Sequence, residues 1–427
     1  MKTRLLLFLA CLPALALPAI SAESARFDWP QWRGPDRNDI SKENDLQKDW
    51  GAGGPDLLWT YKEAGAGYSG PSVVGNHYFS MGADEKQEYV FCLDAAKGTK
   101  VWSVPVGERL QNGWGDGPRS TPTVDGDKVY ALAGRGNLVC LQAADGKTVW
   151  EKSLVKDLGG NVPGWGYCES PLIDGDKVVV TPGGGKGAVA ALDKKTGEVV
   201  IWRSKGFTDG AQYSSLVISN AGGVKQYVQM TGQCVAGVAA DDGRLLWRHD
   251  CKNPTAAIPT PIVDGNFVWS TSGYGAGCRL VEVDPAGAGK VAAKEVYANK
   301  DMSDHHGGVV KVGDYLYGHS NNGGWMCMKF DDGKVVWKEN KKLGKGCLTC
   351  AGDRLYLYSE GDGTCVLIEP SPDGWKEHGR FKIPEQTKLP RQGGHIWTHP
   401  VVANGRLYLR DQDLIFAFDV RTKAAGQ

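Results

Sequence analysis

One short unit occurs three times in nearly the same form along this chain: an Asp-Gly turn, a short apolar run and a Trp. DGKTVW occupies Asp145–Trp150, DGRLLW occupies Asp242–Trp247, and DGKVVW occupies Asp332–Trp337. A single active-site motif needs no copies, whereas a structural repeat consists of them. We therefore expect most of the chain to be one small structural unit, copied many times.

The spacing of the copies indicates the size of that unit. The turn glycines recur about every 40–50 residues, the length of a four-stranded propeller blade. A strand–turn–strand pattern precedes most copies, as in Ser120–Leu132 and His399–Arg410, and a third strand leads into the turn. The turn glycines are Gly98, Gly146, Gly197, Gly243, Gly289, Gly333 and Gly374.

Four strands in a meander cannot bury both faces of their sheet alone, but radial stacking buries those faces between neighbouring units. High Gly and Trp contents, 59 and 15 residues, agree with tight turns and large apolar anchors. Blades are expected to begin near Gly70, Gly117, Glu169, Tyr213, Thr260, Gly307, Gly346 and Thr398.

The two ends of the repeat region are incomplete in complementary ways. The last blade ends without a Trp strand, whereas DLLWTYK (Asp56–Lys62) is a Trp strand with no blade before it. The N-terminal strand should therefore complete the last blade and remove the open edge. The predicted fold is an all-β, eight-bladed β-propeller of four-stranded antiparallel blades, closed by an N-terminal strand.

The first residues differ from the rest. Lys2 and Arg4 precede an apolar stretch and then small residues, which is typical of a secretory signal peptide. We expect a signal peptide over 1–22, a leader packed on the propeller over 23–55, the propeller over 56–421 and a tail over 422–427. No later segment is long and apolar enough to span a bilayer. A periplasmic or secreted protein, not membrane-spanning and monomeric, is expected.

Charge and cysteine usage narrow the function classes. Lys+Arg and Asp+Glu both number 49, so no global field favours nucleic acid as a partner. Of 11 cysteines, Cys347 and Cys350 form a C-x-x-C, but Ala351 follows where haem attachment needs His. This pair is expected to pack or to form a local disulfide rather than to act in redox chemistry.

The repeat resembles that of PQQ-like (quinoprotein-type) eight-bladed propellers. The unit [LV]-[DQA]-x₃-G-x₃₋₄-W, preceded by S/T-P-x-[VI]-x-G-[DN], covers about residues 55–421. The leader Phe27–Ser41 looks like that of exported bacterial members. The resemblance implies that leader residues Trp29, Trp32 and Arg33 pack on the propeller rim. It also implies that Trp residues dock between adjacent blades, namely Trp102, Trp150, Trp202, Trp247 and Trp337.

Each blade should present one loop residue to the axial funnel, three positions before the Pro of its first strand or at the equivalent place. These ring residues are Tyr68, Arg119, Cys168, Tyr213, Ile258, His306, Lys345 and Trp397. The predicted ligand-binding residues are Tyr68, Trp114, Arg119, Trp165, Glu169, Tyr213, His305, His306, Lys345, His395 and Trp397.

This set suggests several kinds of contact. Arg119 and Lys345 can hold an anion, Glu169 or His306 can exchange protons, and Trp side chains can stack on a planar or sugar ligand. Adjacent His305 and His306 on extended chain point to opposite sides, so no metal site is predicted.

The resemblance alone does not decide the function, because the fold hosts unrelated activities. Related propellers include alcohol and sugar dehydrogenases, which use pyrroloquinoline quinone (PQQ) with Ca²⁺, and the propeller lipoprotein of outer-membrane barrel assembly. Here no Glu, Asn and Asp set matches the Ca²⁺ pattern, and no two cysteines are adjacent. We expect a binding or scaffold module with a protein partner or a small-molecule or sugar ligand at the funnel. The alternatives are a PQQ-dependent oxidoreductase and a carbohydrate-binding or sugar-active protein.

Overall fold

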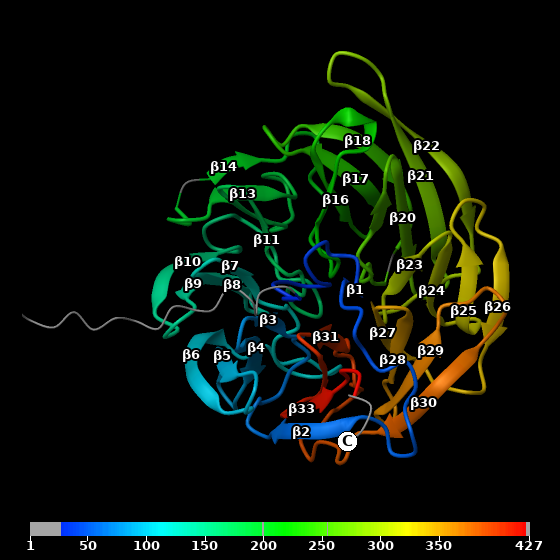
Figure 1. The fold of residues 1–427 in the computed structure, drawn as a ribbon. Coiled ribbons are helices and arrows are strands. Elements are labelled where there is room, and N and C mark those ends of the chain that lie inside the picture. Colours follow the sequence, from blue (N-terminus) through cyan, green and yellow to red (C-terminus); the bar gives the residue numbers. More distant parts are fainter. Residues whose placement is uncertain (1–26, 199, 254, 424–427) are drawn as a thin grey trace, which may run out of the picture.

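Eight antiparallel sheets stand in a ring around a central axis in the computed structural model (Figure 1). The structure describes residues 27–198, 200–253 and 255–423. The predicted eight-bladed, all-β propeller is confirmed, and the only helical segment in the described part is the 3₁₀ turn η2 (Ala221–Gly223). The signal-peptide prediction for 1–22 lies outside the described residues.

Blades 1 to 4 follow each other in chain order, each from its innermost to its outermost strand (Figure 1). Blade 1 consists of β3 (Ser72–Val74), β4 (His77–Ala83), β5 (Gln87–Asp94) and β6 (Lys100–Glu108). Blade 2 consists of β7 (Thr123–Asp125), β8 (Lys128–Leu132), β9 (Asn137–Gln142) and β10 (Thr148–Ser153). Blade 3 consists of β11 (Leu172–Asp174), β12 (Lys177–Val180), β13 (Ala190–Asp193) and β14 (Val200–Arg203). Blade 4 consists of β15 (Val217–Ser219), β16 (Gln226–Met230), β17 (Cys234–Ala239) and β18 (Leu245–Asp250).

Blades 5 to 8 complete the ring. Blade 5 consists of β19 (Ile262–Asp264), β20 (Phe267–Ser272), β21 (Gly277–Pro285) and β22 (Val291–Asn299). Blade 6 consists of β23 (Val309–Val312), β24 (Tyr315–Ser320), β25 (Gly324–Lys329) and β26 (Val335–Glu339). Blade 7 consists of β27 (Gly346–Ala351), β28 (Arg354–Ser359), β29 (Thr364–Glu369) and β30 (Lys376–Lys382). Blade 8 takes β31 (Val401–Ala403), β32 (Arg406–Asp411) and β33 (Leu414–Asp419) from the C-terminal end and β2 (Asp56–Tyr61) from the N-terminal side.

The predicted closure of the ring is confirmed by the pairing within blade 8. Strand β2 runs antiparallel to β33, with Asp56 opposite Asp419 and Tyr61 opposite Ile415. The two strands are separated by almost the whole chain, and they lie side by side at the ring's seam (Figure 1). This pairing removes the open edge that a chain of eight consecutive blades would otherwise leave.

The repeated turn glycine and the repeated Trp meet across four blade boundaries, where Gly98 lies against Trp59, Gly146 against Trp102, Gly197 against Trp150 and Gly243 against Trp202. Trp102 of blade 1 is 9% exposed and donates its indole N–H to the Ala143 carbonyl of blade 2 at 2.9 Å. Gly146 of the blade 2 turn has φ +74°, and a Cβ built there would lie 2.6 Å from the Trp102 ring. Glycine is therefore required both by the backbone and by the ring beneath it. The predicted docking of these Trp residues between blades is confirmed.

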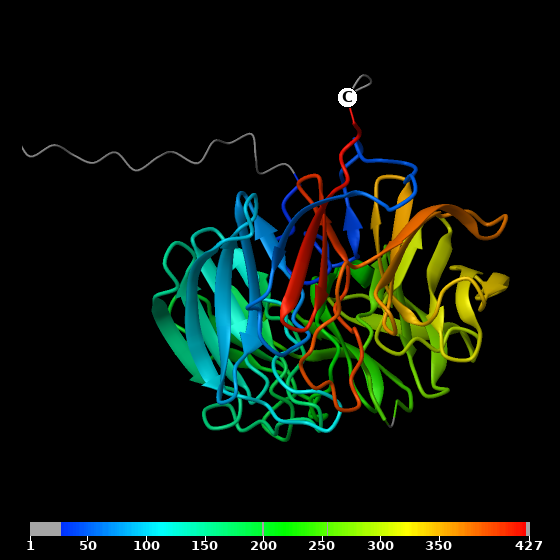
Figure 2. The ribbon, with the colours of Figure 1, turned by 90° about the horizontal axis from the view of Figure 1, so that it is seen from below.

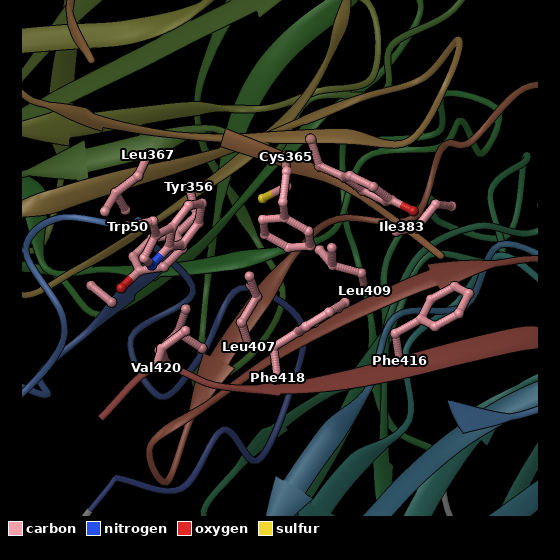
Figure 3. Packing of buried hydrophobic residues seen from close by; sticks show 14 of the residues in the cluster. Trp50, Tyr356, Cys365, Leu367, Ile383, Leu407, Leu409, Phe416, Phe418 and Val420 are labelled. Atoms are coloured by element: carbon pink, nitrogen blue, oxygen red, sulfur yellow. The ribbon is translucent and has the colours of Figure 1, made fainter. Parts of the chain in front are cut away.

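Apolar side chains fill the space between adjacent blades, so the core is a series of layers rather than one centre. Figure 3 shows the layer between blades 7 and 8, where Tyr356 and Leu367 face Leu407 and Phe418. The leader residue Trp50 packs edge-on against Tyr356 with ring centroids 5.7 Å apart. The leader is therefore part of this core.

The cysteines are buried or half-buried and none forms a disulfide among the described residues. Cys347 and Cys350 lie three positions apart on β27, so their side chains point to opposite faces of that strand. This geometry explains why the C-x-x-C does not close a local bridge. No helix in the described part of the chain has the length and apolar character needed to cross a membrane.

Candidate functional site

A cavity of about 290 Å³ lies on the propeller axis. Each of the eight blades repeats the same path from its loop into its inner strand, so residues at the same offset arrive at the same radius. All eight predicted ring residues line this cavity, one from each blade: Tyr68, Arg119, Cys168, Tyr213, Ile258, His306, Lys345 and Trp397.

The leader closes one end of the cavity. Residues Trp32 and Arg33 line the cavity, and β1 (Ile40–Ser41) pairs in parallel with β27. Figure 2 shows the leader lying together with the C-terminal end on one side of the ring. The leader contacts every blade. From blade 1 to blade 8, the contacting pairs are Trp29 with Val73, Pro30 with Val124, Arg37 with Pro171, Arg37 with Leu216, Trp32 with Thr260, Arg33 with Val309, Ile40 with Cys350 and Glu43 with Gly405.

The prediction that Trp32 and Arg33 pack on the rim is wrong, because both residues lie at the axis and form the floor of the cavity. Arg33 is 2% exposed, pairs with Asp39 at 3.3 Å and donates to the Val309 carbonyl at 2.6 Å. Trp32 donates its indole N–H to Thr260 at 2.9 Å. The floor is thus buried and hydrogen-bonded to blades 5 and 6, and it is supplied by a segment outside the repeat.

Aromatic side chains surround the open mouth at the other end. Trp114 and Tyr274 also line the cavity and are 55% and 51% exposed, respectively. Trp165 and Tyr213 stack with their centroids 4.9 Å apart and an interplanar angle of 28°. Such rings offer flat apolar contact surface at low conformational cost.

A cluster of charged and imidazole groups occupies one side of the cavity wall. Glu360 accepts a hydrogen bond from His306 Nε2 at 2.6 Å and another from the Trp397 indole at 2.9 Å. Lys345 Nζ lies 3.7 Å from Glu360 and 2.5 Å from His305 Nδ1. These groups therefore hold one another in place.

The protonation states follow from burial and from these contacts. Burial lowers the pKa of His306 to about 4, and burial together with the nearby His306 and Lys345 lowers the pKa of His305 to about 3. Burial opposes ionisation of Glu360, but the hydrogen bond from His306 and the charge of Lys345 outweigh it and lower its pKa to about 2. At neutral pH the two imidazoles are neutral and Glu360 is a carboxylate.

This cluster does not present a nucleophile to the cavity. Cys347 Sγ lies 3.4 Å from His306 Nδ1, so a thiol, an imidazole and a carboxylate stand in sequence. However, Cys347 is fully buried, does not line the cavity, and burial raises the pKa of its thiol well above the ordinary range. Reactive cysteines are partly exposed with a lowered pKa. The arrangement of the Cys347 thiol, the His306 imidazole and the Glu360 carboxylate therefore has a structural role.

Ten of the eleven predicted ligand-binding residues line the cavity, and Glu169 does not. Glu169 lies behind the wall, where it accepts hydrogen bonds from the Thr181 backbone N–H at 2.6 Å and from the Gln229 amide at 3.0 Å. Lining residues outside the predicted set include Trp32, Arg33, Tyr274, Glu360 and His399.

Glu169→Gln is expected to raise the melting temperature by several kelvin at pH 8 and by much less at pH 5. Burial raises the pKa of Glu169 from 4.5 to about 7. Such a carboxyl contributes stability that is fully present below pH 4.5 and is lost as pH rises through 7, on the order of 3 kcal/mol in all. Calorimetric melting of both proteins at the two pH values measures the effect. The exposed Glu198→Gln is the control, and an equal shift at both pH values would contradict the prediction.

The lining residues do not fit a calcium–quinone centre. Ca²⁺ takes six to eight oxygen ligands, several of them carboxylate oxygens. Among the described residues, Glu360 is the only acidic side chain lining the cavity. Its Oε2 already accepts from both His306 and Trp397, and its Oε1 lies 3.7 Å from Lys345 Nζ. The cations Arg119 and Lys345 line the same cavity. The described residues also contain no group of three or more His, Cys, Asp or Glu side chains placed to hold a metal ion.

Two curated proteins that this chain resembles in sequence are outer membrane protein assembly factors. This chain is 25% identical over 293 residues to outer membrane protein assembly factor BamB of Shewanella oneidensis, covering 65% of this chain and 71% of that protein. It is 26% identical over 330 residues to the protein of the same name from Salmonella typhimurium, covering 74% and 76%.

Comparisons of the structure support the fold alone. BamB from Moraxella catarrhalis superposes with a TM-score of 0.62 at 14% identity, covering 86% of this chain and 98% of that chain. A quinohemoprotein alcohol dehydrogenase from Comamonas testosteroni gives a TM-score of 0.61 at 14% identity, covering 96% and 83%. The two similarities are nearly equal, so they do not separate a scaffold from an oxidoreductase.

A family model also matches the sequence itself. The model described as outer membrane protein assembly factor BamB matches residues 86–339, which is more than half of the chain. This chain therefore belongs to the BamB-type family of PQQ-like repeat propellers.

Proposed function

We propose that this chain is a periplasmic binding scaffold that holds a segment of a protein partner at the mouth of its axial cavity. The observation that carries the proposal is the shape of the cavity, which has a floor built by the leader and an open mouth with exposed aromatic rings. Trp114 and Tyr274 project there at 55% and 51% exposure. Exposed aromatic residues around a concave site are typical of protein recognition.

The chemistry of the wall supports binding rather than catalysis. Glu360, His306 and Lys345 satisfy one another, and Cys347 is fully buried. Cys168, the thiol that lines the cavity, donates to the Gly166 carbonyl at 3.5 Å, and burial raises the pKa of its thiol to about 12. A substrate would find no nucleophile with a free general base beside it. The poor fit to a calcium–quinone centre counts against an oxidoreductase in the same way.

The curated relatives support a partner in outer-membrane protein assembly. Both are named as outer membrane protein assembly factors and share about a quarter of their aligned residues with this chain. The exposed aromatic side chains at the mouth of the cavity agree with contact to another protein in such a process. We therefore place the partner among the proteins of that process, on the periplasmic side.

A photo-crosslinking amino acid in place of Trp114 is expected to give a discrete adduct with one protein in the native host. The Trp114 side chain lies at the mouth, so a bound segment must pass within reach of it. Val101 on β6 is a matched control, because it is 48% exposed but lies on an outer strand away from the cavity. Immunoblotting and mass spectrometry of the adduct measure the outcome.

Two results would contradict this function. One is an equal pattern of adducts at Trp114 and Val101, which would mean non-specific contact. The other is a bound chromophore and dye reduction when the purified protein receives PQQ, Ca²⁺ and an alcohol or aldose. Either result would favour a different role for the cavity.

A further inference from the structure

The ring of eight residues has two chemically different halves. Because the blades follow chain order around the axis, the residues of blades 7, 8, 1 and 2 are neighbours (Figure 1). This arc is Lys345, Trp397, Tyr68 and Arg119, and it carries both cations of the ring. The facing arc is Cys168, Tyr213, Ile258 and His306, whose imidazole is neutral at pH 7 because burial lowers its pKa to about 4. A ligand on the axis thus meets positive charge on one side and apolar groups on the other.

The two cations of the ring differ in their partners. Lys345 lies 3.7 Å from Glu360, so its charge is partly neutralised. Arg119 has no acidic side chain within 4 Å among the described residues, and its Nη1 is buried and has no hydrogen-bond partner there. The third cation lining the cavity, Arg33, is paired with Asp39. Arg119 is therefore the one lining cation in the described structure without a carboxylate within 4 Å, and the Glu88 carboxyl interacts with its charge only from farther away.

Arg119 is also held in a fixed position. Its Nε donates to the Trp165 carbonyl at 3.2 Å and its Nη2 donates to the Gly115 carbonyl at 2.8 Å. Its guanidinium carbon lies 4.7 Å from the centroid of the Tyr68 ring, which supports the group from one face. An arginine that is already ordered loses little conformational entropy when it binds a carboxylate.

A flat apolar platform adjoins this guanidinium. Trp165, whose carbonyl accepts from Arg119, stacks on Tyr213 with ring centroids 4.9 Å apart. The platform and the cation therefore lie on neighbouring blades and face the same cavity of about 290 Å³. A cavity of this size accommodates a ring-sized group rather than a folded domain.

We propose that the cavity binds a carboxylate borne on a flat apolar group, with the carboxylate on Arg119 and the flat group against Trp165 and Tyr213. This rests on the proposed function, in which a partner segment supplies both groups as an acidic and an aromatic side chain. A free aromatic acid carries the same chemistry, so the test includes both sources.

Matched pairs of probes separate the carboxylate from the ring. Indole-3-propionate and its amide represent the free acid, and acetyl-Asp-Trp-amide and acetyl-Asn-Trp-amide represent the segment. Calorimetric titration of the full mature protein is expected to show about tenfold to hundredfold tighter binding of the acid than of the amide in at least one pair. A preference confined to the dipeptides would assign the site to a partner segment, and one confined to indole-3-propionate would assign it to a free acid.

Variants test whether Arg119 is the group responsible. Arg119→Gln is expected to abolish the preference for the acid, and Arg119→Lys is expected to keep part of it. Arg135→Gln is the matched control, because Arg135 is an exposed arginine that follows β8 of the same blade and does not line the cavity. The control should leave the preference unchanged, and melting curves verify that all variants are folded.

Three outcomes would overturn the proposal: equal affinity for acid and amide, a preference that survives Arg119→Gln, or no binding of any probe at millimolar concentration. These outcomes are independent of the crosslinking test. A discrete adduct at Trp114 without a carboxylate preference would keep the scaffold function and remove only the assignment of its ligand chemistry.

Discussion

Deleting residues 56–62 is expected to lower the melting temperature by at least about 10 °C. The deleted segment contains β2, the outermost strand of blade 8 and the strand that closes the ring. Trp59 and Tyr61 are each 8% exposed, and the Trp59 indole donates to the Ala95 carbonyl of blade 1 at 3.0 Å. Losing one buried aromatic side chain costs about 3–5 kcal/mol, and the deletion removes two. Each kcal/mol lowers the melting temperature of a chain of this size by up to about 2–4 °C. Differential scanning calorimetry measures the effect.

The deletion needs a control for the shortened connection. Replacing residues 56–62 by a glycine–serine segment of equal length keeps the connection and should be equally destabilising. Shortening the tip of the β21–β22 hairpin, where Ala286–Lys290 are all exposed, should change the melting temperature little. If the deleted and full-length proteins melted alike, the seam between β2 and β33 would not hold the ring closed.

The repeat explains how the fold and the ring residues followed from sequence. The turn glycine of one blade lies under the Trp of the preceding blade, as Gly146 lies under Trp102, so the two residues recur together. Four copies carry this constraint, whereas Gly289, Gly333 and Gly374 face no Trp ring, and these copies can still be assigned from their spacing to the neighbouring copies. The ring residues could be predicted for the same reason. A residue that stands the same number of positions before the inner strand in each blade reaches the same position at the axis.

Residues outside the repeat could not be placed in this way. The leader occurs once, so no second copy indicated that Trp32 and Arg33 lie on the axis rather than on the rim. Glu169 was singled out because it follows the ring residue Cys168, but successive residues of an extended segment point to opposite sides. Glu169 therefore points into the wall, where Thr181 and Gln229 satisfy it.

A signal for two missed residues was present in the chain. Tyr274 lies in the turn between β20 and β21, and Glu360 lies in the turn between β28 and β29. Both turns join the second and third strands of a blade and reach the mouth side of the cavity. Including this turn from every blade beside the loop before the inner strand would have found both residues.

Arg37→Met is expected to destabilise the protein by about 3–5 kcal/mol and to loosen the leader. Arg37 is 4% exposed, and its guanidinium donates to the carbonyls of Ser170, Pro171 and Leu216, on blades 3 and 4. Burial lowers its pKa to about 10, so it is still charged at neutral pH. A methionine has similar length but cannot donate, so those contacts are lost while most of the packing is kept.

Two measurements distinguish release of the leader, caused by loss of the Arg37 hydrogen bonds, from a general loss of stability. Urea unfolding gives the free energy, and limited proteolysis under native conditions reports whether the leader is released before the blades unfold. Arg244→Met is the control, because Arg244 pairs with Asp241 at the surface and exposed pairs contribute less than about 1 kcal/mol. Early cleavage within the leader of Arg37→Met alone would show that this side chain holds the floor of the cavity in place. Cleavage at the wild-type rate, with unchanged unfolding, would mean that the remaining leader contacts hold the floor without it.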